Sequence, residues 1–270
     1  LILGTLVSLV ALFTLKETGG WYALIVGVLF ASEMYLTRNG WFEIGLPILF
    51  NIGVLLILRD FDITRSFHHL LAYSLVWLGS DLIAHLTFAH LRPLKWIVRG
   101  VGALLTIVNY GALLSFADAK TGTLDFGIYT LLVLTINLVY RQPNLLYAFT
   151  LTLPLFVIFG FRAIGVEKWI HPVIFVAMIY YAAGFFLRLS LRERAKDWDT
   201  ALLFSGLGWG VIISMAAPIV GGLDAAIPVA IAATLWAAEA FAKKNAWLAL
   251  PANGLYLLGY FIILVELNVD

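Results

Sequence analysis

The sequence predicts an all-α, polytopic integral membrane protein with about 11 transmembrane helices, arranged as nearly three four-helix repeats. Three observations lead to this fold class: the composition, the long apolar segments and the spacing of a few landmark residues. Hydrophobic residues make up 62% of the 270 residues, charged residues only 12%, and the mean hydropathy is +0.97. A soluble domain carries roughly 25% charged residues. The composition therefore indicates a chain that folds in lipid.

Composition also excludes several classes of function. The net charge of +1 provides no concentrated basic face, so we expect no nucleic acid as a partner. The absence of cysteine excludes disulfides, thiolate metal ligands and cysteine nucleophiles. The sequence contains no nucleophile elbow, phosphate-binding loop or zinc motif. We therefore expect no catalytic residues, no cofactor and no metal; membrane lipids are the expected partners, with other membrane subunits as a further class.

Eleven apolar segments approach the length of about 20 residues that a transmembrane helix needs. Helices are favoured over strands because an open sheet cannot span lipid. The segment at 2–15 is short, and the chain opens on Leu1, so we expect the start of the first repeat to be cut. The segments in order cover residues 2–15, 21–37, 41–58, 67–89, 95–116, 125–140, 144–162, 170–189, 200–217, 225–241 and 246–265.

Charged residues gather in the connections between the segments and predict an orientation. Eleven of the 17 basic residues fall on one set of connections, whereas most acids fall on the other. The positive-inside rule places the basic set in the cytoplasm, with the protein in the cell or cytoplasmic membrane. The basic set comprises Arg38, Arg92, Lys95, Arg99, Arg141, Arg188, Arg192, Arg194, Lys196, Lys243 and Lys244. Tryptophans at the segment ends fit an interfacial aromatic belt.

The spacing of landmarks predicts an internal repeat. Arg141 precedes Lys243 by 102 residues, Trp96 precedes Trp198 by the same number, and Arg38 precedes Arg141 by 103. Such regularity is typical of a duplicated unit. It predicts units at 1–91, 92–190 and 191–270, the last with three helices and its end cut. Arg38, Arg141 and Lys243 each sit in a short turn, which also contains Asn39, Gln142 or Asn245.

Two acids lie shortly before these turns and predict charge pairs at the membrane interface. Glu239 lies four residues before Lys243, which is the spacing of neighbours on one helix face. Glu33 lies five residues before Arg38, and Asn137 occupies the corresponding place in the middle unit. A local ion pair is favoured over an ion or proton site, because a charge near an interface costs little.

Asp81 is the strongest candidate for a functional residue. It lies within the apolar segment 67–89, with His85 four residues further on the same helix face. A carboxylate there has to be paired, protonated or hydrated. Asp81 and His85 could relay protons or hold a substrate, although a structural pair is favoured. A metal site that adds His68, His69 or His90 is not supported, because the ligand spacing fits no metal motif.

These features lead to three hypotheses of function. The leading one is a non-catalytic multi-pass repeat module that is part of a longer membrane protein or a subunit of a membrane complex. The alternative is a transporter or lipid-handling channel, and a third is an intramembrane enzyme that acts on a lipid-linked substrate near Asp81. The substrate or proton path of the alternative would be lined by Asp81, His85, Asn51, Asn109 and Asn253.

Overall fold

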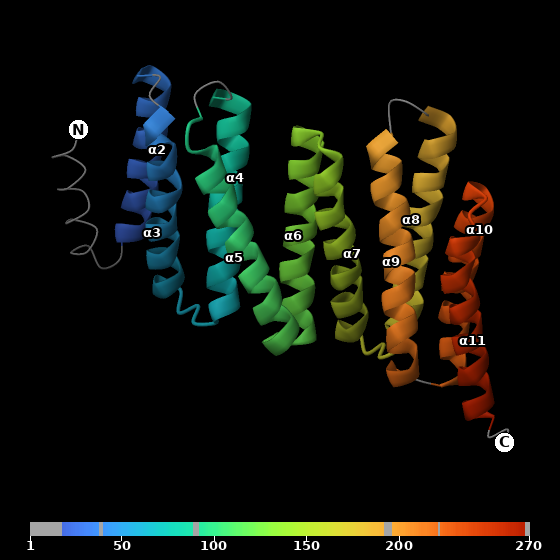
Figure 1. Ribbon diagram of the computed structural model, residues 1–270. Coiled ribbons are helices and arrows are strands. Elements are labelled where there is room, and N and C mark those ends of the chain that lie inside the picture. The colour runs from blue at the N-terminus through green and yellow to red at the C-terminus, as the bar shows by residue number, and fades with distance from the viewer. Residues whose placement is uncertain (1–17, 38–39, 89–91, 192–195, 221, 268–270) are drawn as a thin grey trace. The chain divides into compact units, whose positions relative to one another are not determined.

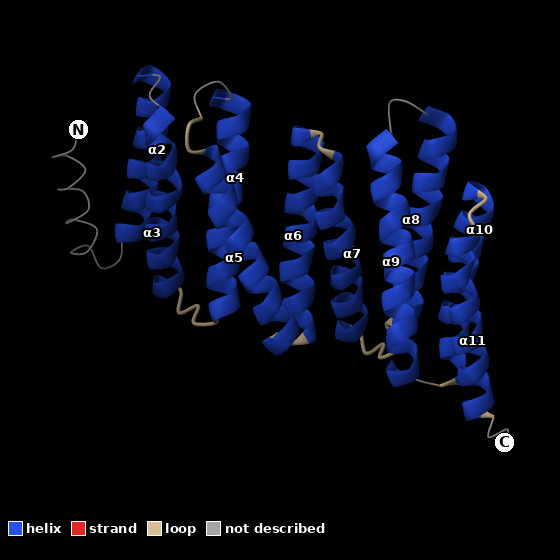
Figure 2. Ribbon diagram, in the orientation of Figure 1, coloured by secondary structure: helices blue, strands red, loops and turns tan. Residues whose placement is uncertain are grey.

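The computed structural model of the protein describes residues 18–37, 40–88, 92–191, 196–220 and 222–267. These residues form α-helices and short 3-10 helices, and none of them lies in a strand (Figure 2). The elements in order are α2 (Gly19–Thr37), η1 (Gly40–Ile44), α3 (Gly45–Asp60), α4 (Ser66–Phe88), α5 (Lys95–Phe116), α6 (Ala119–Tyr140), α7 (Pro143–Ala163), α8 (Ile170–Leu191), α9 (Lys196–Val220), η2 (Leu223–Ala225), α10 (Ala226–Lys243), η3 (Ala246–Leu248) and α11 (Ala249–Glu266).

Within these described ranges, nine helices are long and apolar enough to cross a membrane. They are all the numbered α-helices except α3, which has 16 residues because η1 takes up the start of the predicted segment 41–58. The predicted segment 2–15 lies outside the described residues. The structure thus supports a helical membrane protein with nine candidate spans, whereas the sequence predicts about 11.

The chain divides into two compact units, residues 1–117 and 118–270. The first unit contains the helical hairpins α2–α3 and α4–α5 (Figure 1). The second contains α6–α7, α8–α9 and α10–α11, and its core is formed by α8, α9 and α10, with α7 and α11 packed against them. The three-part division at residues 92 and 191 remains a prediction.

Glycines allow a close backbone contact between α8 and α9 in the second unit. An added Cβ at Gly206 would lie 2.7 Å from the carbonyl oxygen of Ala177 and 2.9 Å from the backbone nitrogen of Tyr181. Gly210, one turn further along α9, faces α10 instead, where an added Cβ would lie 3.2 Å from Cβ of Ala232. In lipid, where all side chains meet apolar surroundings, such close backbone approach is a main source of helix association.

The turns that follow α6 and α10 have the same backbone geometry. Arg141 adopts the left-handed conformation (φ 51°, ψ 40°), as does Lys244 (φ 50°, ψ 39°), and both are followed by an extended residue. The Asn137 side chain donates a hydrogen bond of 3.1 Å to the carbonyl of Gln142, the extended residue after Arg141. Arg141 and Lys244 are 103 residues apart.

The ends of α3 and α7 also match, again with a spacing of 103 residues. Ile63 donates its backbone N–H to the carbonyl of Leu58, and Val166 does so to Phe161, each at 2.9 Å. Asp62 (φ 52°) and Gly165 (φ 84°) supply the left-handed residue in between. The left-handed residue also donates its backbone N–H, from Asp62 to the carbonyl of Arg59 at 3.0 Å and from Gly165 to that of Arg162 at 3.1 Å. Two such hydrogen bonds around a left-handed residue form the Schellman motif, which satisfies the last carbonyls of a helix.

The close approach at Gly206 leads to a test of helix packing. We expect Gly206→Val to destabilise the protein by about 1–3 kcal/mol, because two backbones must separate to accommodate the side chain. Gly208→Val is the matched control on the same helix, since an added Cβ there meets no atom within 4 Å. Unfolding midpoints in detergent micelles measure both; equal midpoints for the two variants would contradict the packing.

Candidate functional site

Four charged residues of the first unit form a buried group that we call the Arg92 cluster: Glu43, Asp81, Arg92 and Arg99. The Arg92 Nη2 atom lies 2.7 Å from Glu43 Oε1 and 2.5 Å from Asp81 Oδ1. Arg92 Nε also donates to Glu43 Oε1, at 2.8 Å. The side chains of Glu43, Asp81 and Arg92 are each at most 3% exposed. One guanidinium therefore joins two carboxylates away from solvent.

Two further contacts complete the Arg92 cluster. Arg99 Nε, on α5, donates to Asp81 Oδ2 at 3.1 Å, and the backbone N–H of Leu94 donates to Glu43 Oε2 at 3.3 Å. Two arginines and two carboxylates sum to zero formal charge. The cluster ties η1, α4 and the start of α5 together at one end of the hairpins, because each element contributes at least one charged group.

The electrostatic balance at Arg92 favours the charged form. Burial acts to lower the pKa of Arg92, but hydrogen bonds and Coulombic attraction from Asp81 and Glu43 together raise that pKa above its ordinary value. A guanidinium is protonated at any physiological pH in any case. Arg92 therefore remains a permanent cation between its two carboxylates.

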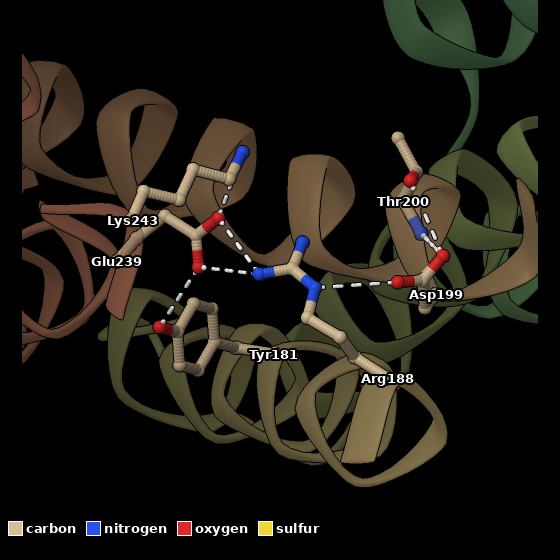
Figure 3. A network of polar contacts seen from close by, with 6 residues as sticks. All are labelled: Tyr181, Arg188, Asp199, Thr200, Glu239 and Lys243. Atoms are coloured by element: carbon tan, nitrogen blue, oxygen red, sulfur yellow. Dashed lines mark hydrogen bonds and ion pairs between the residues drawn. The ribbon is translucent and has the colours of Figure 1, made fainter. Parts of the chain in front are cut away.

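A second, partly buried group lies in the second unit (Figure 3), and we call it the Arg188 cluster: Tyr181, Arg188, Asp199, Glu239 and Lys243. Arg188 lies on α8 and bridges two helices: its Nη1 is 3.2 Å from Glu239 Oε1 on α10, and its Nε is 3.3 Å from Asp199 Oδ2 on α9. Lys243 Nζ is 3.0 Å from Glu239 Oε1, and the Tyr181 hydroxyl donates to Glu239 Oε2 at 3.2 Å.

The formal charges of the Arg188 cluster also sum to zero, and its side chains differ in their exposure to solvent. Its two carboxylates are nearly enclosed, with side-chain exposures of 2% for Glu239 and 9% for Asp199, whereas Arg188 is 30% exposed. Asp199 additionally accepts the backbone N–H of Thr200 at 2.7 Å and lies in the first turn of α9, where a negative charge suits the helix dipole. Three helices, α8, α9 and α10, meet at this group.

The two clusters use opposite charge polarity in comparable hairpins. In α4–α5 the acid, Asp81, lies on the first helix and Arg99 on the second. In α8–α9 the base, Arg188, lies on the first helix and Asp199 on the second.

The structure places the sequence-predicted charge pairs as follows. Lys243 contacts Glu239 at the one-turn spacing, but the main partner of Glu239 across helices is Arg188, which sequence spacing does not indicate. Glu33 is partly exposed on α2, and its carbonyl accepts the Thr37 hydroxyl at 2.7 Å. Arg38 lies outside the described residues.

The predicted path residues belong to different units. Asn51 (α3), Asp81 and His85 (α4) and Asn109 (α5) lie in the first, and Asn253 (α11) lies in the second. The contacts described for Asp81 are those with Arg92 and Arg99, and sequence reasoning anticipated a partner without identifying either arginine. Asn109 is fully buried, whereas Asn253 is exposed.

Other polar groups supply no metal centre in the part of the chain that the structure describes, where no three His, Asp or Glu side chains converge. His68 and His69 begin α4, and His69 Nε2 lies 2.5 Å from the carbonyl oxygen of Ile63; His90 lies outside the described residues. A shallow pocket of about 470 Å³ lies near the exposed Lys168–Asp224 ion pair. It is lined by Phe161, Val166, Lys168, His171, Pro172, Phe175 and Asp224.

Comparison with known protein families, curated proteins and solved structures finds no match to this chain. The described part of the chain is therefore characterised by its fold and its two clusters: nine helices long and apolar enough to cross a membrane, with one charge-neutral ion-pair cluster between helices of each unit.

The Arg92 cluster leads to a paired test of stability. We expect Arg92→Gln to cost about 3–5 kcal/mol, because two buried carboxylates lose the guanidinium between them. Arg99→Gln is the control: Arg99 is 28% exposed, so its replacement should cost at most about 1 kcal/mol. Denaturant titration of the purified variants measures the difference. Equal costs would show that Arg92 does not organise the cluster.

Proposed function

We propose that the protein is a non-catalytic, multi-pass membrane module that serves as a structural part of a longer membrane protein or of a membrane complex. The observation that supports this proposal best is the internal neutrality of both clusters. Asp81 and Glu239, which are the obvious candidates for ion or proton chemistry, are both held by arginine.

A transport role demands more from Asp81 than the Arg92 cluster allows. A carboxylate that exchanges protons or binds a passing cation must release its partners during each cycle. Separation of a buried ion pair costs about 3–5 kcal/mol, and here one carboxylate would have to leave two arginines. A fixed role is therefore favoured: the acids anchor helix ends, and the arginines satisfy the acids.

One observation favours the alternative, a transporter or lipid-handling channel near Asp81. The Asn51 Oδ1 atom is buried in α3 and has no hydrogen-bond partner among the described residues. A buried amide oxygen of this kind is suited to a water molecule or a polar substrate. In the proposed structural module, one ordered water would satisfy Asn51 Oδ1. A conducting path would instead need a continuous series of buried polar atoms without protein partners.

The predicted repeat is part of the proposal. Its support comes from the matched backbone of the turns at Arg141 and Lys244 and of the turns at Asp62 and Gly165, both spaced by 103 residues. Turn chemistry is retained in duplicated units because it depends on backbone conformation, whereas lipid-facing side chains can change freely among apolar types.

Proton flux in reconstituted liposomes tests the function. Under an imposed potential, we expect vesicles that contain the wild-type protein to be no more permeable to protons than protein-free vesicles, because Asp81 is held by arginines. A pH-sensitive dye inside the vesicles gives the rate. A wild-type flux that Asp81→Asn abolishes, while Lys120→Gln leaves it intact and both variants stay folded, would overturn the proposal in favour of transport.

The orientation in the membrane is a further expectation of the proposal. Basic turns should face the cytoplasm, so a single cysteine at Gln142 should react with a membrane-impermeant maleimide only in inverted vesicles. A single cysteine at Glu167, in the next connection, should react only from the outside. Because the native chain contains no cysteine, each variant reports one position. Labelling of both from the same side would contradict the topology.

A further inference from the structure

We propose that the pocket at the start of α8 binds an aminophospholipid, that is, a membrane lipid whose headgroup carries both a phosphate diester and a primary ammonium group. This Lys168 pocket has a volume of about 470 Å³ and lies between the end of α7, the start of α8 and η2. The inference requires that the helices lie in lipid, but it does not depend on the role as a structural module.

The Lys168 pocket lies at the ends of three candidate spans. Its residues come from the last turn of Pro143–Ala163, from the connection that follows, and from the first turns of Ile170–Ser190 and Leu223–Lys243. Trp169 follows Lys168 directly, and tryptophan is enriched where a membrane meets water. A lipid headgroup in the same layer of the membrane is therefore at the depth of the pocket.

The polar side of the pocket offers one cation and one anion next to each other. Lys168 Nζ lies 2.6 Å from Asp224 Oδ2, and the two side chains are 50% and 59% exposed. His171 also lines the pocket, and an imidazole carries a ring N–H in either charge state. Lys168 and His171 can donate to phosphate oxygens, whereas Asp224 can accept from an ammonium. Because an exposed ion pair contributes little stability, a headgroup can replace it at small cost.

The remaining lining of the pocket suits an acyl chain. It is apolar and is supplied by Phe161, Val166, Pro172 and Phe175. Phe175 is 59% exposed, and Ile179, one turn further on the same face of α8, is 64% exposed. An apolar surface therefore continues from the ion pair toward the middle of the span. Apolar walls with a few placed polar groups are typical of small-molecule sites.

The paired charges select among the common classes of phospholipid. An anionic lipid has a phosphate for Lys168 but no cation for Asp224, so the carboxylate would lose its partner and repel the ligand. The quaternary ammonium of phosphatidylcholine has no N–H group to donate to Asp224. An aminophospholipid satisfies both side chains, and the unpaired charge that each competitor leaves behind provides the discrimination.

Photo-labelling in vesicles of defined composition tests this inference. The full chain is reconstituted into phosphatidylcholine vesicles that contain a trace of a photoreactive lipid. This probe is phosphatidylethanolamine, phosphatidylcholine or phosphatidylglycerol, each with the same photoreactive acyl chain. We expect peptides that cover residues 161–175 to carry several-fold more adduct from phosphatidylethanolamine than from either of the other two probes.

Three variants separate recognition of the headgroup from general damage. Asp224→Ala should reverse the selectivity in favour of phosphatidylglycerol, because Lys168 then attracts an anionic lipid without a carboxylate beside it. Lys168→Ala should lower labelling by phosphatidylethanolamine to the level of phosphatidylcholine. Arg59→Gln is the matched control, since Arg59 forms an exposed ion pair with Asp60 in the first unit, and it should leave the pattern unchanged. All three variants should keep the unfolding midpoint of the wild type, because they remove only exposed ion pairs.

Equal labelling by the three probes would overturn the inference, as would a preference for phosphatidylethanolamine that persists in Asp224→Ala. Water-soluble phosphoethanolamine distinguishes a lipid from a free polar ligand. If it competes as well as unlabelled phosphatidylethanolamine at the same concentration, the acyl chain contributes nothing and the assignment to a lipid is wrong. None of these results alters the proton flux expected near Asp81, so this inference and the proposed function can fail separately.

Discussion

Buried arginine–carboxylate pairing is the constraint on which the helix arrangement within each unit depends. In the first unit Arg92 lies between Glu43 and Asp81, and in the second Arg188 lies between Asp199 and Glu239. An isolated charge is costly in lipid or in a protein interior, and a planar guanidinium can satisfy two carboxylates at once. Once those acids are present, the helices that carry them have to meet at the arginine.

Apolar packing alone would leave the helices much freer. In a bilayer the lipid tails are as apolar as leucine, so burial of apolar side chains provides little net force between helices. The chain responds with close backbone contacts, such as that at Gly206, and with localised polar bonds, such as that between Thr150 and Ser205. Packing brings helices close along their length, whereas the ion pairs and hydroxyl bonds determine which residues lie opposite each other.

The same physics applies to polar residues on other helices. A polar residue within a membrane span is tolerated where a neighbouring helix provides its partner. Asp81, Glu239 and Thr150 have such partners within their own units. Asn253, on α11, is a polar residue that is exposed in the described structure.

The length of the apolar segments, the composition and the turn residues were sufficient to predict the helices. Ten of the predicted segments coincide with α2 to α11 within a few residues, and the turns at Arg141 and Lys244 fall where the basic hinge residues indicate. The predicted count of about 11 spans is not confirmed, because η1 shortens α3 to 16 residues and the predicted segment 2–15 lies outside the described residues. Local signals of this kind are contained in short windows of sequence.

Only part of the candidate site could be predicted from the sequence. Glu239 with Lys243 follows from one-turn spacing on a helix, and the cost of a buried acid indicated that Asp81 needs a partner. Arg92 and Arg188 could not be identified as the central residues, because their partners lie up to 51 residues away and on other elements. The sequence by itself determined where helices begin and end and which charges need partners. Only the tertiary structure decided which charges meet, because that depends on how helices pack in three dimensions.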